Sequence, residues 1–160
     1  MPASDRSEKL IVPREAEEFD NDVYARLAAA AKLSDIKLIE CDYSIKPEVF
    51  QAIEDTENMA HGFVGDPAGY YVDDEIGLLL GRYKWSAEIK LRRKKVLKLA
   101  CVYLVAYTGV QGFTDNYLQF YFEKIGRFTT YPYFRAEFSR LSSSSGIMLP
   151  PLPSLSERVD

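Results

Sequence analysis

The chain has 160 residues, with 20 Lys plus Arg against 24 Asp plus Glu, and a formal net charge of -4. This length predicts one domain with a core of its own, and the acidic balance argues against a dedicated nucleic-acid binder, which needs a concentrated basic surface. Cys41 and Cys101 lie in separate apolar strand patterns, which predicts two buried free thiols and no disulfide framework.

The first residues indicate an arm and not an export signal. Residues 1–20 are charged and interrupted by proline, so we expect a flexible N-terminal arm followed by one domain over residues 21–160. The start lacks a basic region followed by an apolar run, and no apolar stretch reaches the roughly 18 residues that span a bilayer. We therefore expect a cytoplasmic protein without direct membrane insertion.

The first half of the chain predicts a helix and two strands. "DVYARLAAAAKL", from Asp22, is rich in helix formers, and "DIKLIECDYSI" alternates as a half-buried strand does. The clearest alternation is "GRYKWSAEIKL" over residues 81–91, with one apolar and one wet face. The basic run 92–95 that follows is read as a solvated turn, with a contact to an acidic partner as the alternative.

A third strand follows, and it is apolar on both faces. Period 2 places Leu99, Cys101, Tyr103, Val105 and Tyr107 on one side, and Ala100, Val102, Leu104 and Ala106 on the other. Helices of the same chain can cover one side. We expect a second subunit to cover the other, because such a strand is unusual in an antiparallel sheet with one wet face.

Two helices are predicted next. Thr114 can cap a helix from Asp115 to Ile125 that ends at Gly126, and its apolar residues extend beyond one stripe, which predicts burial on two sides. A second helix is expected at about residues 131–141, with Pro132 in its first turn and an aromatic face.

Two further segments need an explanation. The connection over residues 46–76 is too long for a structureless loop unless it has a function or some local helix. The stretch from Ile147 to Leu155 contains three prolines, so we expect an extended apolar ribbon that lies across the fold.

Residues for catalysis are absent from the sequence. His61 is the only histidine and has no neighbouring cysteine, and the run 73–75 of carboxylates is read as a solvated turn. No phosphate-binding glycine loop or nucleophile elbow occurs. We therefore predict a protein that is not an enzyme and has neither a metal site nor a cofactor. The excess of apolar surface predicts that it binds something apolar.

One part of the chain is similar to a known family. "GRFTTYPYFRAEFSRL", followed by "GIMLPPLPSL", resembles the signature helix and the leucine- and proline-rich segment of the SecB chaperone family. "ARLAAAAKLSDIKLIE" looks most like the SecB-like chaperones found beside toxin-antitoxin pairs. The resemblance covers about residues 22–155, and its specific part is residues 126–155.

The resemblance implies a fold, an assembly and an activity. It implies an α+β fold, in which helices pack on one face of a four-stranded antiparallel sheet, assembled as a homo-tetramer from two dimers. The activity would be that of an ATP-independent holdase, which binds unfolded or precursor polypeptides in hydrophobic grooves without a cofactor.

The resemblance also assigns residues, each with ordinary packing inside the subunit as the alternative. In the family, the long connection and the apolar ribbon wall a groove for client segments. Client contact is therefore expected at Ile147, Met148, Leu149, Leu152 and Leu155, with Phe50, Phe63, Tyr70 and Tyr71 as weaker candidates in a loop. Subunit contact is expected at Ala100, Val102, Leu104, Tyr117, Leu118 and Tyr121.

Several roles stay open at this point. Export members of the family continue past the ribbon into a last helix and a tail that engages the SecA motor ATPase, whereas this sequence ends at Asp160. Delivery of precursors for protein export and translocation is one role, and guarding of an antitoxin is another. Outside the chaperone class, the chain could be an interaction scaffold or a closed pocket for a small apolar ligand.

Overall fold

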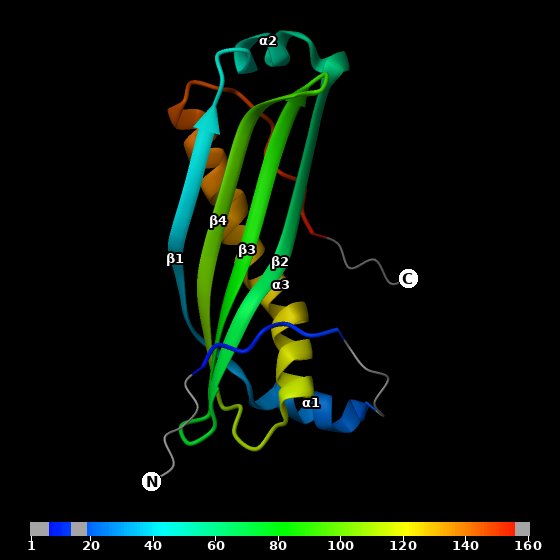
Figure 1. Cartoon of the computed structure of the whole chain (residues 1–160), viewed down its shortest axis with the longest axis vertical. Coiled ribbons are helices and arrows are strands. Elements are labelled where there is room, and N and C mark those ends of the chain that lie inside the picture. The colour runs from blue at the N-terminus through cyan, green and yellow to red at the C-terminus, as the bar shows by residue number, and fades with distance from the viewer. Residues whose placement is uncertain (1–6, 14–18, 156–160) are drawn as a thin grey trace.

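The computed structural model describes residues 7–13 and 19–155 (Figure 1). In chain order its elements are α1 (Asn21–Ala30), β1 (Lys32–Ile45), α2 (Val49–Glu54), the 3-10 helix η1 (Thr56–Asn58), β2 (Met59–Asp73), β3 (Leu78–Leu91), β4 (Lys94–Thr108) and α3 (Asp115–Ser144). Within these residues, no helix has the length and apolar character that crossing a membrane requires.

The four strands form one antiparallel sheet in the order β1-β4-β3-β2. The first two strands thus lie at opposite edges, and α2 with η1 joins them across one end of the sheet (Figure 1). The expected α+β fold with a four-stranded antiparallel sheet is confirmed. The residue pattern alone predicted three of these strands. The fourth, β2, makes up half of the connection over residues 46–76, whose remainder supplies the local helices.

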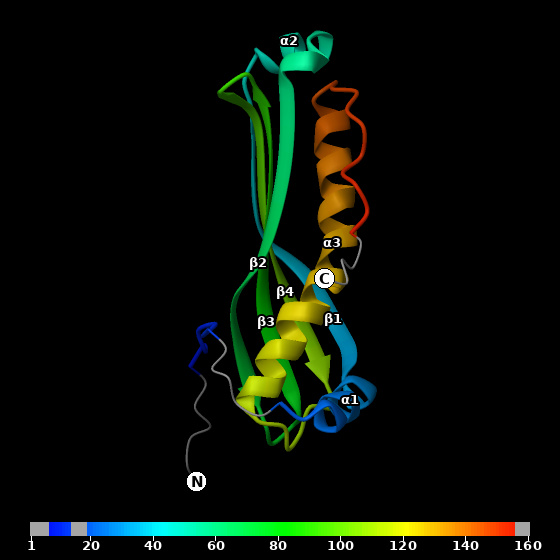
Figure 2. The same cartoon turned by 90° about the vertical axis from the view of Figure 1, so that its right-hand side faces the viewer.

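α3 covers one face of the sheet, and the core lies between them (Figure 2). The alternation predicted in β3 is confirmed, because Tyr83, Trp85, Ala87 and Ile89 are buried on this face. No helix of the described residues lies over the other face (Figure 2). Val102 lies there and is still only 5% exposed, between its register partners Glu40 and Lys84.

α3 is one continuous helix, so the prediction of two helices divided at Gly126 was wrong. Gly126 is needed for close packing: a Cβ there would lie 3.1 Å from the Phe122 ring and 3.2 Å from Tyr83. Pro132 lies inside the helix, on its exposed side. Because proline has no backbone N–H, the Phe128 carbonyl one turn earlier lacks its helical hydrogen bond. Packing of the aromatic side chains on both sides of this point keeps the helix intact.

Trp85 joins α3 to the sheet. Its indole Nε1 donates a hydrogen bond of 2.6 Å to the Thr130 hydroxyl, and the Arg127 guanidinium lies 5.1 Å from the ring centre. Phe134 stacks on the same ring at 5.8 Å. Across the strands, Trp85 pairs with Gly65, where a Cβ would come within 2.5 Å of the indole. The indole therefore occupies space that only a glycine at position 65 leaves open.

The N-terminal residues that the structure describes lie against the fold. Lys9 pairs with Tyr70 at the edge of β2 and forms an ion pair of 2.6 Å with Asp115. Asp20 caps α1, because its carboxylate accepts hydrogen bonds from the backbone of Asp22 and Val23. The rest of the arm predicted over residues 1–20 lies outside the described residues.

A matched pair of glycine substitutions in β2 tests the packing at Trp85. We expect Gly65→Ala to lower the free energy of unfolding by about 1–3 kcal/mol, because the added methyl overlaps the indole. Gly62→Ala is the control, since its Cβ would meet nothing within 4 Å, and we expect a change within about 0.5 kcal/mol. Urea denaturation at one protein concentration measures both. Equal midpoints would contradict the packing described above.

Candidate functional site

The segment after α3, residues 147–155, is called the ribbon below. The chain turns at Gly146, where φ is +74°, and the ribbon runs back along α3 (Figure 2). Ile147 and Leu152 are buried in the core, whereas Met148 is 88% exposed. The expected extended apolar path is therefore observed, with two residues as anchors and one that faces outward.

Side chains from α3 hold the ribbon in place. The Tyr131 hydroxyl donates a hydrogen bond to the Pro153 carbonyl, and Arg135 Nε donates one of 2.6 Å to the Leu152 carbonyl. Burial raises the pKa of Tyr131, so this hydroxyl keeps its proton at neutral pH. No backbone-to-backbone hydrogen bond joins residues 148–155 to another described residue. The ribbon is therefore held by fewer bonds than a strand of the same length.

A narrow apolar groove lies between the ribbon, the start of β2 and α3. It is lined by Met59, His61, Ile89, Phe138, Leu149, Pro150, Pro151 and Leu152. Its free volume is about 30 Å³, which is room for about one water molecule. The ribbon thus packs closely against β2 and α3 and leaves little free space between them.

The weaker client candidates are in different environments. Phe50, on α2, is 50% exposed. Phe63, Tyr70 and Tyr71 lie in β2 and not in a loop, which corrects their predicted setting. The Phe63 ring stacks on Tyr131, with 5.3 Å between the ring centres. Tyr70 is only 4% exposed, and this burial is the main cause that raises its pKa to about 12. Only Phe50 of these four offers a large free surface.

The residues expected at a subunit contact also divide into two groups. Leu118 is fully buried, and Tyr121 packs edge-on against Tyr107 at 5.2 Å, so neither offers surface to a second copy. Their burial has a simple cause: one face of α3 lies on the sheet, and α1 packs beside the same helix. Tyr117 is half-buried, and its hydroxyl accepts a hydrogen bond from the Asp20 backbone. Ala100 and Leu104 are half-buried on the uncovered face.

The sequence analysis missed the exposed edge of β1. Leu33, Leu38 and Ile39 are 49%, 41% and 45% exposed there, because α3 packs on the other three strands. The register shifts between Leu38 and Glu40, which places an extra residue in the strand. The sequence contained one sign of this bulge: Leu38 and Ile39 are two adjacent apolar residues in a stretch that otherwise alternates. Cys41, predicted to be buried, is exposed for the same reason.

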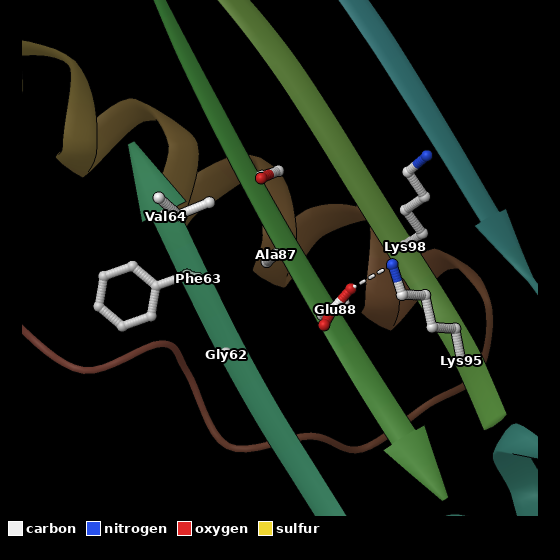
Figure 3. Close-up of a pocket in the computed structure, with 8 residues that line it drawn as sticks. Gly62, Phe63, Val64, Ala87, Glu88, Lys95 and Lys98 are labelled. Carbon is white, nitrogen blue, oxygen red and sulfur yellow. Dashed lines mark ion pairs between the residues drawn. The ribbon is translucent and has the colours of Figure 1, made fainter. Parts of the chain in front are cut away.

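A second hollow, of about 340 Å³, lies on the sheet (Figure 3). Its lining includes Val64, which is 54% exposed, and a rim formed by Glu88, Lys95 and Lys98. Glu88 forms ion pairs with Lys95 at 2.9 Å and with Lys90 at 3.3 Å, and the hydrogen bond from Lys95 is the main cause that lowers the pKa of Glu88. This hollow is open and charged, unlike a pocket for a small apolar ligand.

The chemistry of the described side chains offers no metal centre. Among residues 7–13 and 19–155, no three His, Cys, Asp or Glu side chains are grouped so that they could hold a metal ion.

Removing one hydrogen bond should loosen the ribbon. We expect Arg135→Gln to raise the rate at which a nonspecific protease cleaves residues 147–155 about tenfold, because a hydrogen bond to a charged donor contributes roughly 1.5 kcal/mol and cleavage follows the population of the detached ribbon. Arg140→Gln, on the same helix but paired with Glu137, is the control and should leave the ribbon unchanged. The cleavage rate is measured by mass spectrometry, and equal rates in the two variants would contradict the role of Arg135.

Comparison with known proteins finds a match in fold. No protein-family model matches the chain, and no curated protein matches it. Among solved structures, it is similar to the Mycobacterium tuberculosis Rv1957 SecB-like chaperone, which was solved in complex with a ChAD peptide from the Rv1956 HigA1 antitoxin. The TM-score is 0.70 and the identity is 22%, over 87% of this chain and 100% of that chain. The chain therefore has the fold of a SecB-like chaperone.

Proposed function

We propose that this protein is a holdase chaperone that binds non-native polypeptide segments without ATP and without catalysis. One observation carries the proposal: the SecB-like fold keeps many large apolar side chains in solvent. In the described chain these are Leu10, Val12, Leu33, Leu38, Ile39, Phe50, Val64, Ile76, Phe128, Tyr133 and Met148. Exposed apolar side chains that lie together mark sites that bind other chains, and we propose that those of the ribbon and of β1 are such sites.

Burial of apolar surface supplies the binding energy. A client segment that has not folded exposes apolar side chains, and each 100 Å² buried contributes about 2.5 kcal/mol before the cost of ordering. Single contacts of this size are weak. Several such sites on one oligomer bind strongly together, because the first contact raises the effective concentration of the client at the others. Binding of this kind does not require a particular client sequence, so one chaperone can bind many different clients.

The ribbon is the proposed main contact for clients. Met148 faces solvent, and Leu149 and Leu155 are half-buried beside it, so these three can meet a client side chain directly. Ile147 and Leu152 act mainly as anchors, because both are buried in the core. Phe50 adds an aromatic contact on α2.

The proposed assembly is a homo-tetramer built from two dimers. Ala100 and Leu104 on the uncovered face are one proposed contact, whereas Val102, at 5% exposed, offers as little surface as Tyr121. The edge of β1 around Leu33, toward the end of the strand away from Cys41, is a second. An edge strand with free backbone groups and apolar side chains is a ready surface for pairing with another chain. Tyr117 lies on the helix side as a lesser contact.

Two client classes follow from this activity in a cytoplasmic protein. The first is precursor polypeptides on their way to export, with docking to the SecA motor ATPase as an open possibility. The second is an antitoxin, and the structural neighbour favours it as a second candidate because that protein was solved with an antitoxin peptide.

Light scattering tests the holdase activity. A chemically denatured, unrelated protein is diluted into buffer without ATP, with and without this protein, and the oligomer mass is measured in parallel. We expect suppression of aggregation near one oligomer per client chain. If a folded, oligomeric sample gives no suppression, the protein is a scaffold or ligand carrier and the similarity extends only to fold.

A pair of exposed positions tests the client surface. We expect Met148→Asp to weaken client binding about tenfold, since it removes roughly 1.4 kcal/mol of apolar contact, with an unchanged melting temperature. Ile76→Asp is the control, because Ile76 is also exposed, at 64%, but lies in the turn between β2 and β3, at the other end of the sheet from α2. Fluorescence titration with an unfolded client measures both. Equal losses in the two variants would refute the assignment of Met148.

Leu152 is a different case. Leu152→Asp would place a carboxylate in the core, so we expect loss of stability and not a selective loss of client binding.

A further inference from the structure

Cys41 and Cys101 lie directly opposite each other on neighbouring strands. They are register partners in the antiparallel pair of β1 and β4, and their Sγ atoms are 4.0 Å apart. Opposed residues of such a pair have Cα atoms about 4.5–5.5 Å apart, which is within the roughly 4.4–6.8 Å found for disulfides. The sulfurs need to approach by about 2 Å to reach bonding distance, a movement within reach of side-chain rotation.

The two thiols differ in access. Cys41 is exposed at the edge strand, whereas Cys101 is fully buried under α3. Burial is the main cause that raises the pKa of Cys101, and the neighbouring Cys41 adds to it. Cys101 is therefore a protonated thiol that solvent cannot reach. Cys41 is the sulfur that a dissolved oxidant meets first.

Charged and polar groups of α3 and β4 surround the pair. Arg140 interacts electrostatically with Cys41 and is hydrogen-bonded to Glu137, which in turn interacts with Cys101. The Arg140 side chain is therefore within electrostatic reach of the exposed sulfur. The Tyr103 hydroxyl is buried beside Cys101 and interacts with its thiol. Burial is the main cause that raises the pKa of Tyr103, and the Cys101 thiol adds to it.

We propose that Cys41 and Cys101 are a redox-responsive pair that closes to a disulfide between β1 and β4 on reaction with hydrogen peroxide. The Cys41 thiolate attacks one peroxide oxygen: an S–O bond forms, the O–O bond breaks, and hydroxide leaves and takes up a proton as water. The Cys101 sulfur then attacks Cys41: the S–S bond forms, the S–O bond breaks and a second water leaves. Two thiols lose two electrons, and one peroxide is reduced to two waters.

The disulfide has a structural consequence for the sheet. β1 lies at an edge and meets α3 less than the other strands do, with a hydrogen bond between the Tyr43 and Ser145 hydroxyls at the end of the helix, so the backbone pairing with β4 is its main attachment. A covalent link from its middle to a central strand prevents this strand from separating. It also closes a long loop, which is the case in which a disulfide restricts the unfolded chain most.

Peroxide treatment of the intact protein tests this inference. We expect the wild-type chain to lose both thiols together, with an intact mass lower by two hydrogens and a tryptic peptide that joins Cys41 to Cys101. The melting temperature should rise by about 5–10 °C and return on reduction. A product that is sulfinic acid on Cys41 or a disulfide between two chains would overturn the proposal, as would an unreactive Cys41.

Three variants separate the steps. Cys101→Ser should leave Cys41 reactive but unable to form the disulfide, so that one equivalent of peroxide gives sulfenic acid on Cys41 and excess peroxide oxidises it further. Cys41→Ser should leave Cys101 reduced. Arg140→Gln should slow the loss of thiol about two- to fivefold. The control is Lys37→Gln, which removes a cation from β1, the strand of Cys41, but on the opposite face of the sheet. We expect an unchanged rate of thiol loss in this variant. Equal rates in the Arg140 and Lys37 variants would refute the part assigned to Arg140.

Discussion

The contact between Trp85 and α3 is the constraint on which the rest of the structure depends. A 30-residue helix lies across the strands with one aromatic ring as its central support, and this ring is bonded to Thr130 and stacked on Phe134. The ring has room only because Gly65 faces it. Once α3 is fixed there, its later turns present Tyr131 and Arg135 to the ribbon, and its path leaves much of β1 exposed. The setting of the proposed client surface and of the exposed edge thus follows from the same packing.

Much of the fold could be predicted from local pattern. The alternation around Trp85 correctly gave the buried face of β3, and Asp20 begins the first helix about where the sequence indicated. Strand β2 could not be found in this way, since Gly62, Gly65 and Pro67 remove the apolar alternation that identifies a strand. Residues such as Gly65 are explained by packing against the neighbouring strand, and this packing cannot be seen in a single sequence.

The candidate site was less predictable, because burial depends on which face a segment turns inward. The ribbon was expected to be extended and apolar, and it is, but composition could not tell that Ile147 points into the core while Met148 points out. Leu118 shows the same limit on α3: its helix is apolar around most of its circumference, so the sequence could not say which side meets the sheet. The division at Gly126 failed for a related reason. A glycine that ends a helix and a glycine that admits a neighbouring ring look alike in sequence.

The prolines of the ribbon affect how the protein would aggregate if the ribbon detached from α3 and β2. Pro150, Pro151 and Pro153 have no backbone N–H, so a released ribbon cannot add to the open edge of a sheet as a regular strand. A detached apolar segment would ordinarily recruit further copies into intermolecular β-structure. This one lacks the donors for it, so the protein can loosen an apolar segment without becoming a nucleus for its own aggregation.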